Sequence, residues 1–167
     1  MPMRIVINTR FLLPGRLEGL GGYTHEVARR LVALRPSDEF IFLFDRPFDP
    51  AFVYDERVTP VVVRPPARHP VLWWWWFEQS LPRVLARYRA DVFLSPDGYC
   101  SLRTACPTIM VTHDLAHLHY PDQIPWLVRS YYDHFVPRFL QRAERIVAVS
   151  EYTRRDIIRQ CGIAGGK

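Results

Sequence analysis

Short, almost wholly apolar runs recur along the chain, and stretches with a helical repeat separate them. Each run is five or six residues long, which suits a strand buried on both faces and is too short for a helix. The runs lie at residues 4–9, 40–45, 58–63, 91–95, 108–112 and 145–149. This alternation predicts an α/β fold, with a doubly wound, mostly parallel Rossmann-like sheet covered by helices on both faces.

The segments between the runs predict helices at residues 23–34, 71–88, 125–143 and 151–160. Pro36 is expected to stop the first helix, and Pro137 to kink or split the third, because proline lacks the N–H that continues a helix. Ser150 is expected to cap the last helix and Gly162 to end it.

Polar residues stand where most of these strands end. In an open parallel sheet the ligand sits outside the carboxyl ends of the strands, near the point where the strand order reverses. The rule therefore selects the strand-end residues as candidates for a binding site. They are Asn8, Arg10, Asp45, Asp97, His113, Asp114, Ser150 and Glu151.

Glycines precede the first predicted helix, in the sequence from Gly19 to Thr24. Glycines at a helix start let backbone N–H groups approach an anion, which makes Gly21, Gly22 and Tyr23 candidates for phosphate contact. The spacing nearly matches a dinucleotide fingerprint, with Asp45 as the ribose acid. However, the glycines lie far beyond the strand end and the third is replaced by threonine, so the pattern favours a loop reaching across a cleft.

Three histidines and an aspartate lie close together after the fifth strand, at His113, Asp114, His117 and His119. No Glu or Cys completes a metal-binding set in this segment, so we expect no metal. His113 is instead expected to donate to a ligand hydroxyl or a developing charge. Asp114 is expected either to orient His113 or to cap the next turn.

A run of four tryptophans, residues 73–76, opens the second predicted helix. Trp73 and Trp76 fall on its apolar face, as part of a wide core surface. Trp74 and Trp75 point elsewhere and need another neighbour, for which a loop, a second domain, an acceptor lipid or a membrane interface all remain open.

Composition narrows the class of protein. With 167 residues, 49% of them hydrophobic and 23% charged, the chain is expected to form a single globular domain. The net charge of +5 is spread over the chain and comes almost entirely from arginine, and no nucleic-acid-binding signature accompanies it. The three cysteines form no CxxC pair, which is typical of free thiols in a reducing compartment. We therefore expect a cytoplasmic location.

Several segments together resemble the amino-terminal half of a GT-B glycosyltransferase of family 4, a retaining group. The matching segments are residues 21–24, 78–82, 111–114, 120–121 and 145–156. The last segment, a strand followed by a serine cap and a helix, is the most specific. The resemblance covers nearly the whole chain.

The resemblance implies one wall of a cleft between two Rossmann-like domains. Gly21, Gly22 and Tyr23 would reach the donor diphosphate, while His113 and Asp114 would lie near the transferred sugar. Asn8, Arg10, Asp97, Ser150 and Glu151 would face a saccharide or lipid-linked acceptor. The nucleotide-sugar would be a co-substrate held mainly by a carboxy-terminal domain, with no metal or other cofactor.

Residues 1–167 are expected to be this domain alone, without the donor domain and inactive by itself. The exposed interdomain face is expected to allow a homodimer, and peripheral contact with the inner face of a membrane is a further expectation. Two other readings stay open, namely half of a sugar-nucleotide epimerase and a non-catalytic Rossmann-like binding module. A nicotinamide-dependent oxidoreductase is the least favoured alternative.

Overall fold

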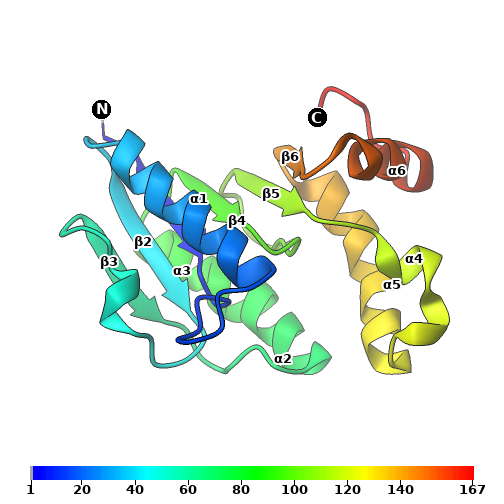
Figure 1. Cartoon of the computed structure of the whole chain (residues 1–167), viewed down its shortest axis with the longest axis horizontal. Helices are drawn as coiled ribbons and strands as arrows, with labels where there is room; N and C mark the ends of the chain where they lie inside the picture. The colour runs from blue at the N-terminus through cyan, green and yellow to red at the C-terminus, as the bar shows by residue number, and fades with distance from the viewer. Residues whose placement is uncertain (1) are drawn as a thin grey trace.

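The computed structural model describes residues 2–167, and its centre is one six-stranded sheet in the order β3-β2-β1-β4-β5-β6 (Figure 1). Every neighbouring pair is parallel. The strands are β1 (Arg4–Asn8), β2 (Glu39–Phe44), β3 (Val58–Val62), β4 (Val92–Ser95), β5 (Thr108–Thr112) and β6 (Arg145–Ala148). The predicted α/β fold is therefore confirmed, with all six strands in place.

The strand order reverses around β1, which pairs with β2 on one side and with β4 on the other. Strands β2 and β3 lie in that order on one side of β1, and strands β4, β5 and β6 lie in that order on the other side. This arrangement puts the topological switch point between the carboxyl ends of β1 and β4, which is where such sheets bind ligands.

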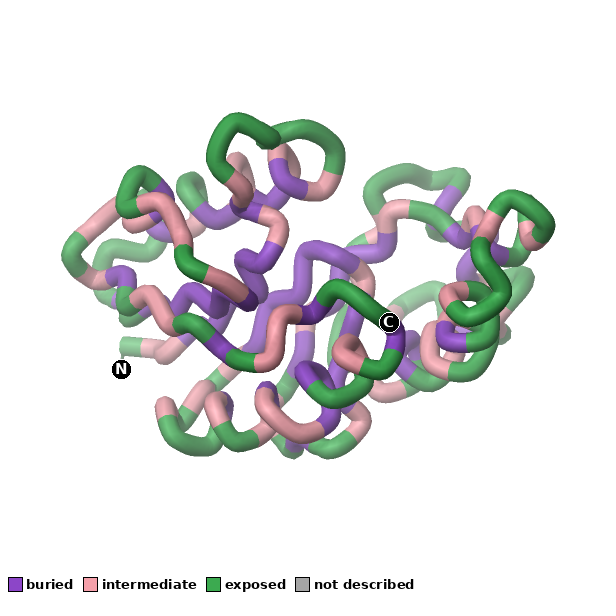
Figure 2. Tube along the Cα trace, turned by 90° about the horizontal axis from the view of Figure 1, so that it is seen from below, coloured by how far each residue is buried: buried purple, intermediate pink, exposed green. Residues whose placement is uncertain are grey.

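Two apolar cores lie on opposite faces of the sheet because successive strand residues point to opposite sides. Ile5 and Ile7 pack into the core beneath helix α1 (Leu20–Leu34), whereas Val6 packs into the core on the other face. That second core receives α3 (Leu81–Arg87), α5 (Trp126–Arg142) and α6 (Glu151–Cys161). Figure 2 shows the buried stretches running through the middle of the molecule.

Helix α6 follows its sequence signals, whereas α5 does not split at its internal proline. The Ser150 Oγ atom accepts a hydrogen bond from the Thr153 N–H at 3.1 Å, and Gly162 ends α6 in the left-handed region with φ of 64°. Both predictions are confirmed. Helix α5 continues through Pro137 as a single helix, so the predicted split does not occur. The buried Phe139 and Leu140 anchor the segment beyond the proline.

The single helix predicted at 71–88 is interrupted by a π-helical turn. Helix α2 (Pro70–Trp75) and α3 flank the turn, which is labelled η2 (Trp76–Ser80). Pro82 has no N–H to donate to the carbonyl of Glu78, and the Leu81 N–H bonds the Trp76 carbonyl five residues back. The proline therefore explains the change in the hydrogen-bond pattern.

The remaining helical segments are short. They are the 3-10 turns η1 (Pro50–Phe52) and η3 (Pro121–Gln123) and the helix α4 (Ala116–His119). Within residues 2–167, every helix is too short or too polar to span a bilayer.

Candidate functional site

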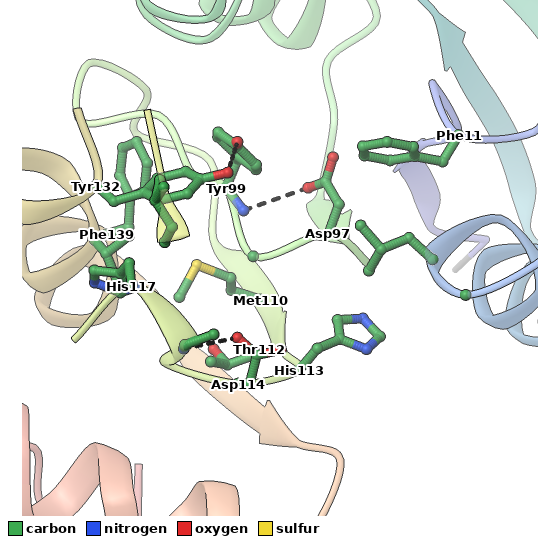
Figure 3. Close-up of a pocket in the computed structure, with 16 residues that line it drawn as sticks. Phe11, Asp97, Tyr99, Met110, Thr112, His113, Asp114, His117, Tyr132 and Phe139 are labelled. Atoms are coloured by element: carbon green, nitrogen blue, oxygen red, sulfur yellow. Dashed lines mark hydrogen bonds between the residues drawn. The ribbon is translucent and has the colours of Figure 1, made fainter. Parts of the chain in front are cut away.

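A cavity of about 430 Å³ opens at the carboxyl edge of the sheet. It lies between the start of α1, the ends of β4 and β5, and the helices α4 and α5. Figure 3 shows aromatic side chains of α5 on one side, with Phe11 and His113 on the other and Met110 between them. The site thus occupies the edge that parallel topology predicts.

His113 stands directly beyond β5, and both its ring and its backbone are fixed. Its Nε2 atom lies 2.7 Å from the Pro96 carbonyl oxygen, which can only accept, so Nε2 carries the proton. The Thr153 hydroxyl donates to the His113 carbonyl at 3.0 Å. These contacts leave Nδ1 as the ring atom available to a ligand, as an acceptor in the neutral ring or a donor in the charged one.

The start of α1 and His113 lie on the same rim of the cavity. The Tyr23 ring meets the His113 ring edge-on, with centroids 4.9 Å apart, and Gly19 and Leu20 line the cavity. The backbone N–H groups at the beginning of this helix are therefore near the histidine. Their partial positive charge favours an anion at that point.

Gly21 and Gly22 have a packing role that explains where α1 begins. A Cβ atom on Gly21 would lie 2.7 Å from the Phe11 carbonyl oxygen, and one on Gly22 would lie 3.0 Å from that of Leu17. The loop before the helix therefore folds directly against these glycines. Helix α1 starts at Leu20 rather than at the predicted residue 23, so both glycines lie in its first turn.

Asp114 lines the cavity but is not bonded to the His113 ring. Its Oδ1 atom accepts from the Ala116 N–H at 2.9 Å, while the ring is bonded to Pro96. Of the two roles predicted for Asp114, the structure has the one that caps the next turn.

Thr112 adds a polar group that is not used within the protein. It lines the cavity, and its Oγ1 atom is buried with no hydrogen-bond partner among residues 2–167. An unpaired buried hydroxyl is unfavourable, and a ligand that bonds it would remove that cost. Thr112 and His113 therefore both border one cavity, with the unbonded Thr112 Oγ1 atom buried beneath its wall.

The opposite wall is aromatic and was not predicted as part of a site. Tyr132, Val136 and Phe139 of α5 line the cavity, and they recur at the spacing of one helix face. That spacing was a readable signal, but it does not indicate which strand end the face will meet. A mostly apolar wall with few polar groups is typical of small-molecule sites.

Asp97 lies at the centre of a buried hydrogen-bond network. Its Oδ2 atom accepts from Arg10 Nε at 2.6 Å and from Asn8 Nδ2 at 2.8 Å. Its Oδ1 atom accepts from the Ser95 hydroxyl at 2.9 Å and from the Tyr99 N–H at 3.3 Å. Both carboxylate oxygens are therefore occupied by donors from the protein, although Asp97 also borders the cavity.

Arg10 is enclosed by aromatic rings. Its guanidinium carbon lies 4.4 Å from the Tyr99 ring centroid and 5.2 Å from that of Phe77. Burial alone would lower the pKa of Arg10, but the charge and hydrogen bonds of Asp97 outweigh it and raise the pKa. Asn8 and Arg10 do not line the cavity. They tie the end of β1 to the end of β4 rather than facing a ligand.

Ser150 and Glu151 are placed elsewhere. They border a second hollow, of about 270 Å³, together with residues of β6 and α6. Ser150 caps α6, and Glu151 pairs with Arg154 and Arg155 at 3.3 and 3.0 Å. The five residues predicted to face the acceptor therefore do not surround a single cavity, and only Asp97 borders the one that contains His113.

The residues on which the dinucleotide-binding and metal-binding alternatives depend are bonded within the protein. Asp45 is buried, binds Arg46 at 2.5 Å and accepts from the Ala67 N–H at 3.0 Å, so it is not a free ribose acid. His119 bonds Asp156 at 2.7 Å, while His117 is buried beside Tyr132. Among residues 2–167, no three His, Cys, Asp or Glu side chains are grouped as metal ligands.

Residues 78–82, another segment that resembles a family motif, have a structural role. The Glu78 carboxylate accepts from the Leu102 N–H at 3.0 Å, and the Ser80 hydroxyl donates to the Arg64 carbonyl at 2.7 Å. Burial raises the pKa of Glu78. The segment holds the π turn against two loops.

Comparison with known proteins decides the family. The sequence model of glycosyltransferase family 4 matches residues 17–167. The chain belongs to glycosyltransferase family 4. Its matched region includes the start of α1, the cavity and the whole of β6 and α6. A search of curated protein sequences finds no match to this chain.

One solved glycosyltransferase structure shares the fold of this family 4 domain. A glycosyltransferase from Rickettsia africae is 14% identical, with a TM-score of 0.53, over 99% of this chain and 41% of that one. An α-glucosyltransferase solved with UDP and a 13-mer DNA is 13% identical, with a TM-score of 0.36, over 89% and 38% of the two chains. This chain thus spans less than half the length of each.

Proposed function

We propose that this chain forms the acceptor-side domain of a retaining glycosyltransferase. The enzyme would move a hexose from a nucleotide-sugar to a saccharide or lipid-linked acceptor. Membership of family 4 supports glycosyl transfer. The observation that supports the acceptor role is the cavity at the carboxyl edge of β4 and β5, which joins His113 and Thr112 to an aromatic wall.

In the proposed reaction, the bond between the anomeric carbon and the donor diphosphate breaks as the acceptor hydroxyl attacks from the same face. The acceptor proton passes to the departing phosphate oxygen, so the atoms balance without a protein nucleophile. The main requirement is stabilisation of the charge that develops on the diphosphate. At the start of α1 the N–H groups of Gly21 and Tyr23 already donate to the carbonyls of Glu18 and Gly19, so those of Leu20 and Gly22 are the ones suited to that role.

His113 and Thr112 are proposed to position the sugar hydroxyls. The ring of His113 is held by Pro96 through Nε2, which leaves Nδ1 without a bond, and the Thr112 hydroxyl has no partner among the described residues. The apolar face of a sugar ring fits against Tyr132 or Phe139 on the other wall. The reaction as proposed uses the nucleotide-sugar as co-substrate and no resident cofactor.

The donor is proposed to bind mainly to a carboxy-terminal domain that faces this cavity. On that basis, residues 1–167 alone should bind an acceptor analogue but should not turn over a nucleotide-sugar. The described cavity supplies two histidines, His113 and the buried His117, and one helix start, which leaves most of the leaving-group charge without a partner.

The test is to measure the binding of p-nitrophenyl hexopyranosides to the chain by calorimetry or by NMR. Ala116 lines the cavity, so Ala116→Phe should fill it and abolish binding. Ala86→Phe is the matched control, since Ala86 is exposed on α3 and lies outside the cavity lining. Equal binding by both variants would contradict the proposal, as would turnover of a nucleotide-sugar by the isolated chain.

A further inference from the structure

A group of exposed apolar side chains lies at one end of the molecule, apart from the cavity. It comprises Val71, Trp74 and Trp75 of α2 with Trp126 and Leu127 of α5, and we refer to these five residues as the aromatic rim. Their exposed fractions are 60% for Val71, 37% for Trp74, 47% for Trp75, 77% for Trp126 and 37% for Leu127. Figure 1 shows the starts of α2 and α5 at the same lower end of the molecule.

The two halves of the aromatic rim meet around a hollow of about 440 Å³. Val71 and Trp74 line it from α2, and Leu127 lines it from α5. Tyr131 also contributes to its wall, and the hydroxyl of Tyr131 is buried with no hydrogen-bond partner among residues 2–167. The exposed wall of the hollow is thus almost wholly apolar, because the Tyr131 hydroxyl lies buried behind it, and such a wall suits an apolar occupant.

The tryptophan run explains why the rim is exposed. Trp73 donates its indole N–H to the Ala67 carbonyl at 2.9 Å, and Trp76 donates to the Val63 carbonyl at 3.1 Å. These two indole rings therefore pack within the protein and hold the loop before α2. Trp74 and Trp75 face away and contact each other edge-on, with centroids 6.3 Å apart. Four adjacent tryptophans on one helix cannot all reach a single core.

Charge complementarity indicates what covers the rim. Arg68 and His69 immediately precede α2 and are exposed, and Arg68 forms no ion pair with any described residue. The chain as a whole carries a net charge of +5. Exposed tryptophans beside an unpaired arginine are suited to the interface of an anionic bilayer, where the indole ring is buried and its N–H stays near the headgroups.

We propose that the aromatic rim docks this chain onto the surface of an anionic lipid bilayer. Val71, Trp74, Trp75, Trp126 and Leu127 insert among the headgroups, and Arg68 contacts lipid phosphate. A second copy of the chain fits this surface less well, because pairing two rims would bring their arginines together. The proposal does not depend on the proposed function, since it concerns a surface outside the cavity.

The experiment is sedimentation of the chain with phosphatidylcholine vesicles that contain phosphatidylglycerol, and with vesicles of phosphatidylcholine alone. The chain should bind the anionic vesicles more tightly, and its tryptophan fluorescence should shift to shorter wavelength. The Trp74→Ser/Trp75→Ser double variant should lose binding about tenfold, and Trp126→Ser should also weaken it. Arg68→Gln should reduce binding and its dependence on salt.

Tyr152→Ser is the matched control, because Tyr152 is 72% exposed but lies on α6 outside the rim. It should bind as the unaltered chain does. Thermal melting of each variant checks that the fold is intact, which exposed positions should preserve. Unchanged binding by the double variant, equal binding to both kinds of vesicle, or dimerisation through the same tryptophans without vesicles would overturn the proposal.

Discussion

Two groups of polar residues at the same edge of the sheet differ in how their hydrogen bonds are used. Around Asp97, every carboxylate oxygen is bonded to donors from Asn8, Arg10, Ser95 or Tyr99. Around His113, one ring nitrogen is fixed by Pro96 and the neighbouring Thr112 hydroxyl has no partner within residues 2–167. The first group holds the switch point together, and the second has bonding capacity left for a ligand.

The difference shows that position at a strand end is not enough to make a residue functional. Both groups satisfy the topological rule for ligand sites in parallel sheets. The two groups differ in whether their donors and acceptors are already bonded within the protein, and these bonds are visible only in the structure. Variants that remove one group or the other should therefore affect different properties of the protein.

The largest effect is expected from Asp97→Ala. The change leaves the Arg10 charge buried without a counterion, since its side chain is only 4% exposed. Breaking a buried pair in this way should lower the free energy of unfolding by about 3–5 kcal/mol. Urea unfolding measures it. Asp55→Ala is the control, because its pair with Arg57 is partly exposed to solvent and should contribute much less to stability.

Gly21→Ala should have the next largest effect. The added methyl group would meet the Phe11 carbonyl oxygen at 2.7 Å, so the loop must move away from α1. Overpacking of this kind should cost about 1–3 kcal/mol in unfolding free energy. Gly166→Ala is the matched control, because nothing lies within 4 Å of its added Cβ. Equal melting temperatures for the two variants would show that the glycine is not needed for packing.

Thr112→Val sharpens the contrast between the two groups. It removes a hydroxyl that is not bonded within the described protein, so the stability should change by less than about 1 kcal/mol. Affinity for p-nitrophenyl hexopyranosides should fall about fivefold, as expected for the loss of one hydrogen bond. Ser95→Ala should do the reverse, with lower stability and unchanged affinity. A stability loss for Thr112→Val equal to that for Ser95→Ala would remove the distinction.

The smallest effect is a dependence on pH from His117, which lines the same cavity. Burial lowers the pKa of His117 from its ordinary value of 6.5. The unfolded chain therefore takes up a proton as the pH falls below 6.5, before the folded chain does, and the free energy of unfolding decreases. His117→Phe should flatten this decrease. Melting curves from about pH 7.5 down to about pH 5 test it, and parallel profiles for the two proteins would contradict it.

The sheet and its strand sequence could be predicted because buried parallel strands leave a strong local pattern. Residues 40–44, which alternate between two cores, are apolar at every position, so the run is visible without knowing its partners. Ser150 and Gly162 were equally predictable because capping depends on neighbours within a few residues. The family motifs at residues 21–24 and 145–156 carried the family assignment.

The site was only partly predictable because its geometry depends on distant contacts. His113 and the start of α1 do share a rim, joined by the Tyr23 ring. The sequence near Asn8 and Arg10 does not show that both side chains will donate hydrogen bonds to Asp97, which is about ninety residues away in the chain. The early start of α1 and the π turn likewise follow from the loop at Phe11 and from Pro82.

The most direct test of the central claim is a structure of the chain with a p-nitrophenyl hexopyranoside bound. We expect the sugar ring in the cavity of about 430 Å³, with hydroxyls bonded to His113 Nδ1 and Thr112 Oγ1 and one ring face on α5. A sugar bound instead in the hollow beside Ser150 and Glu151, with the His113 cavity empty, would contradict it.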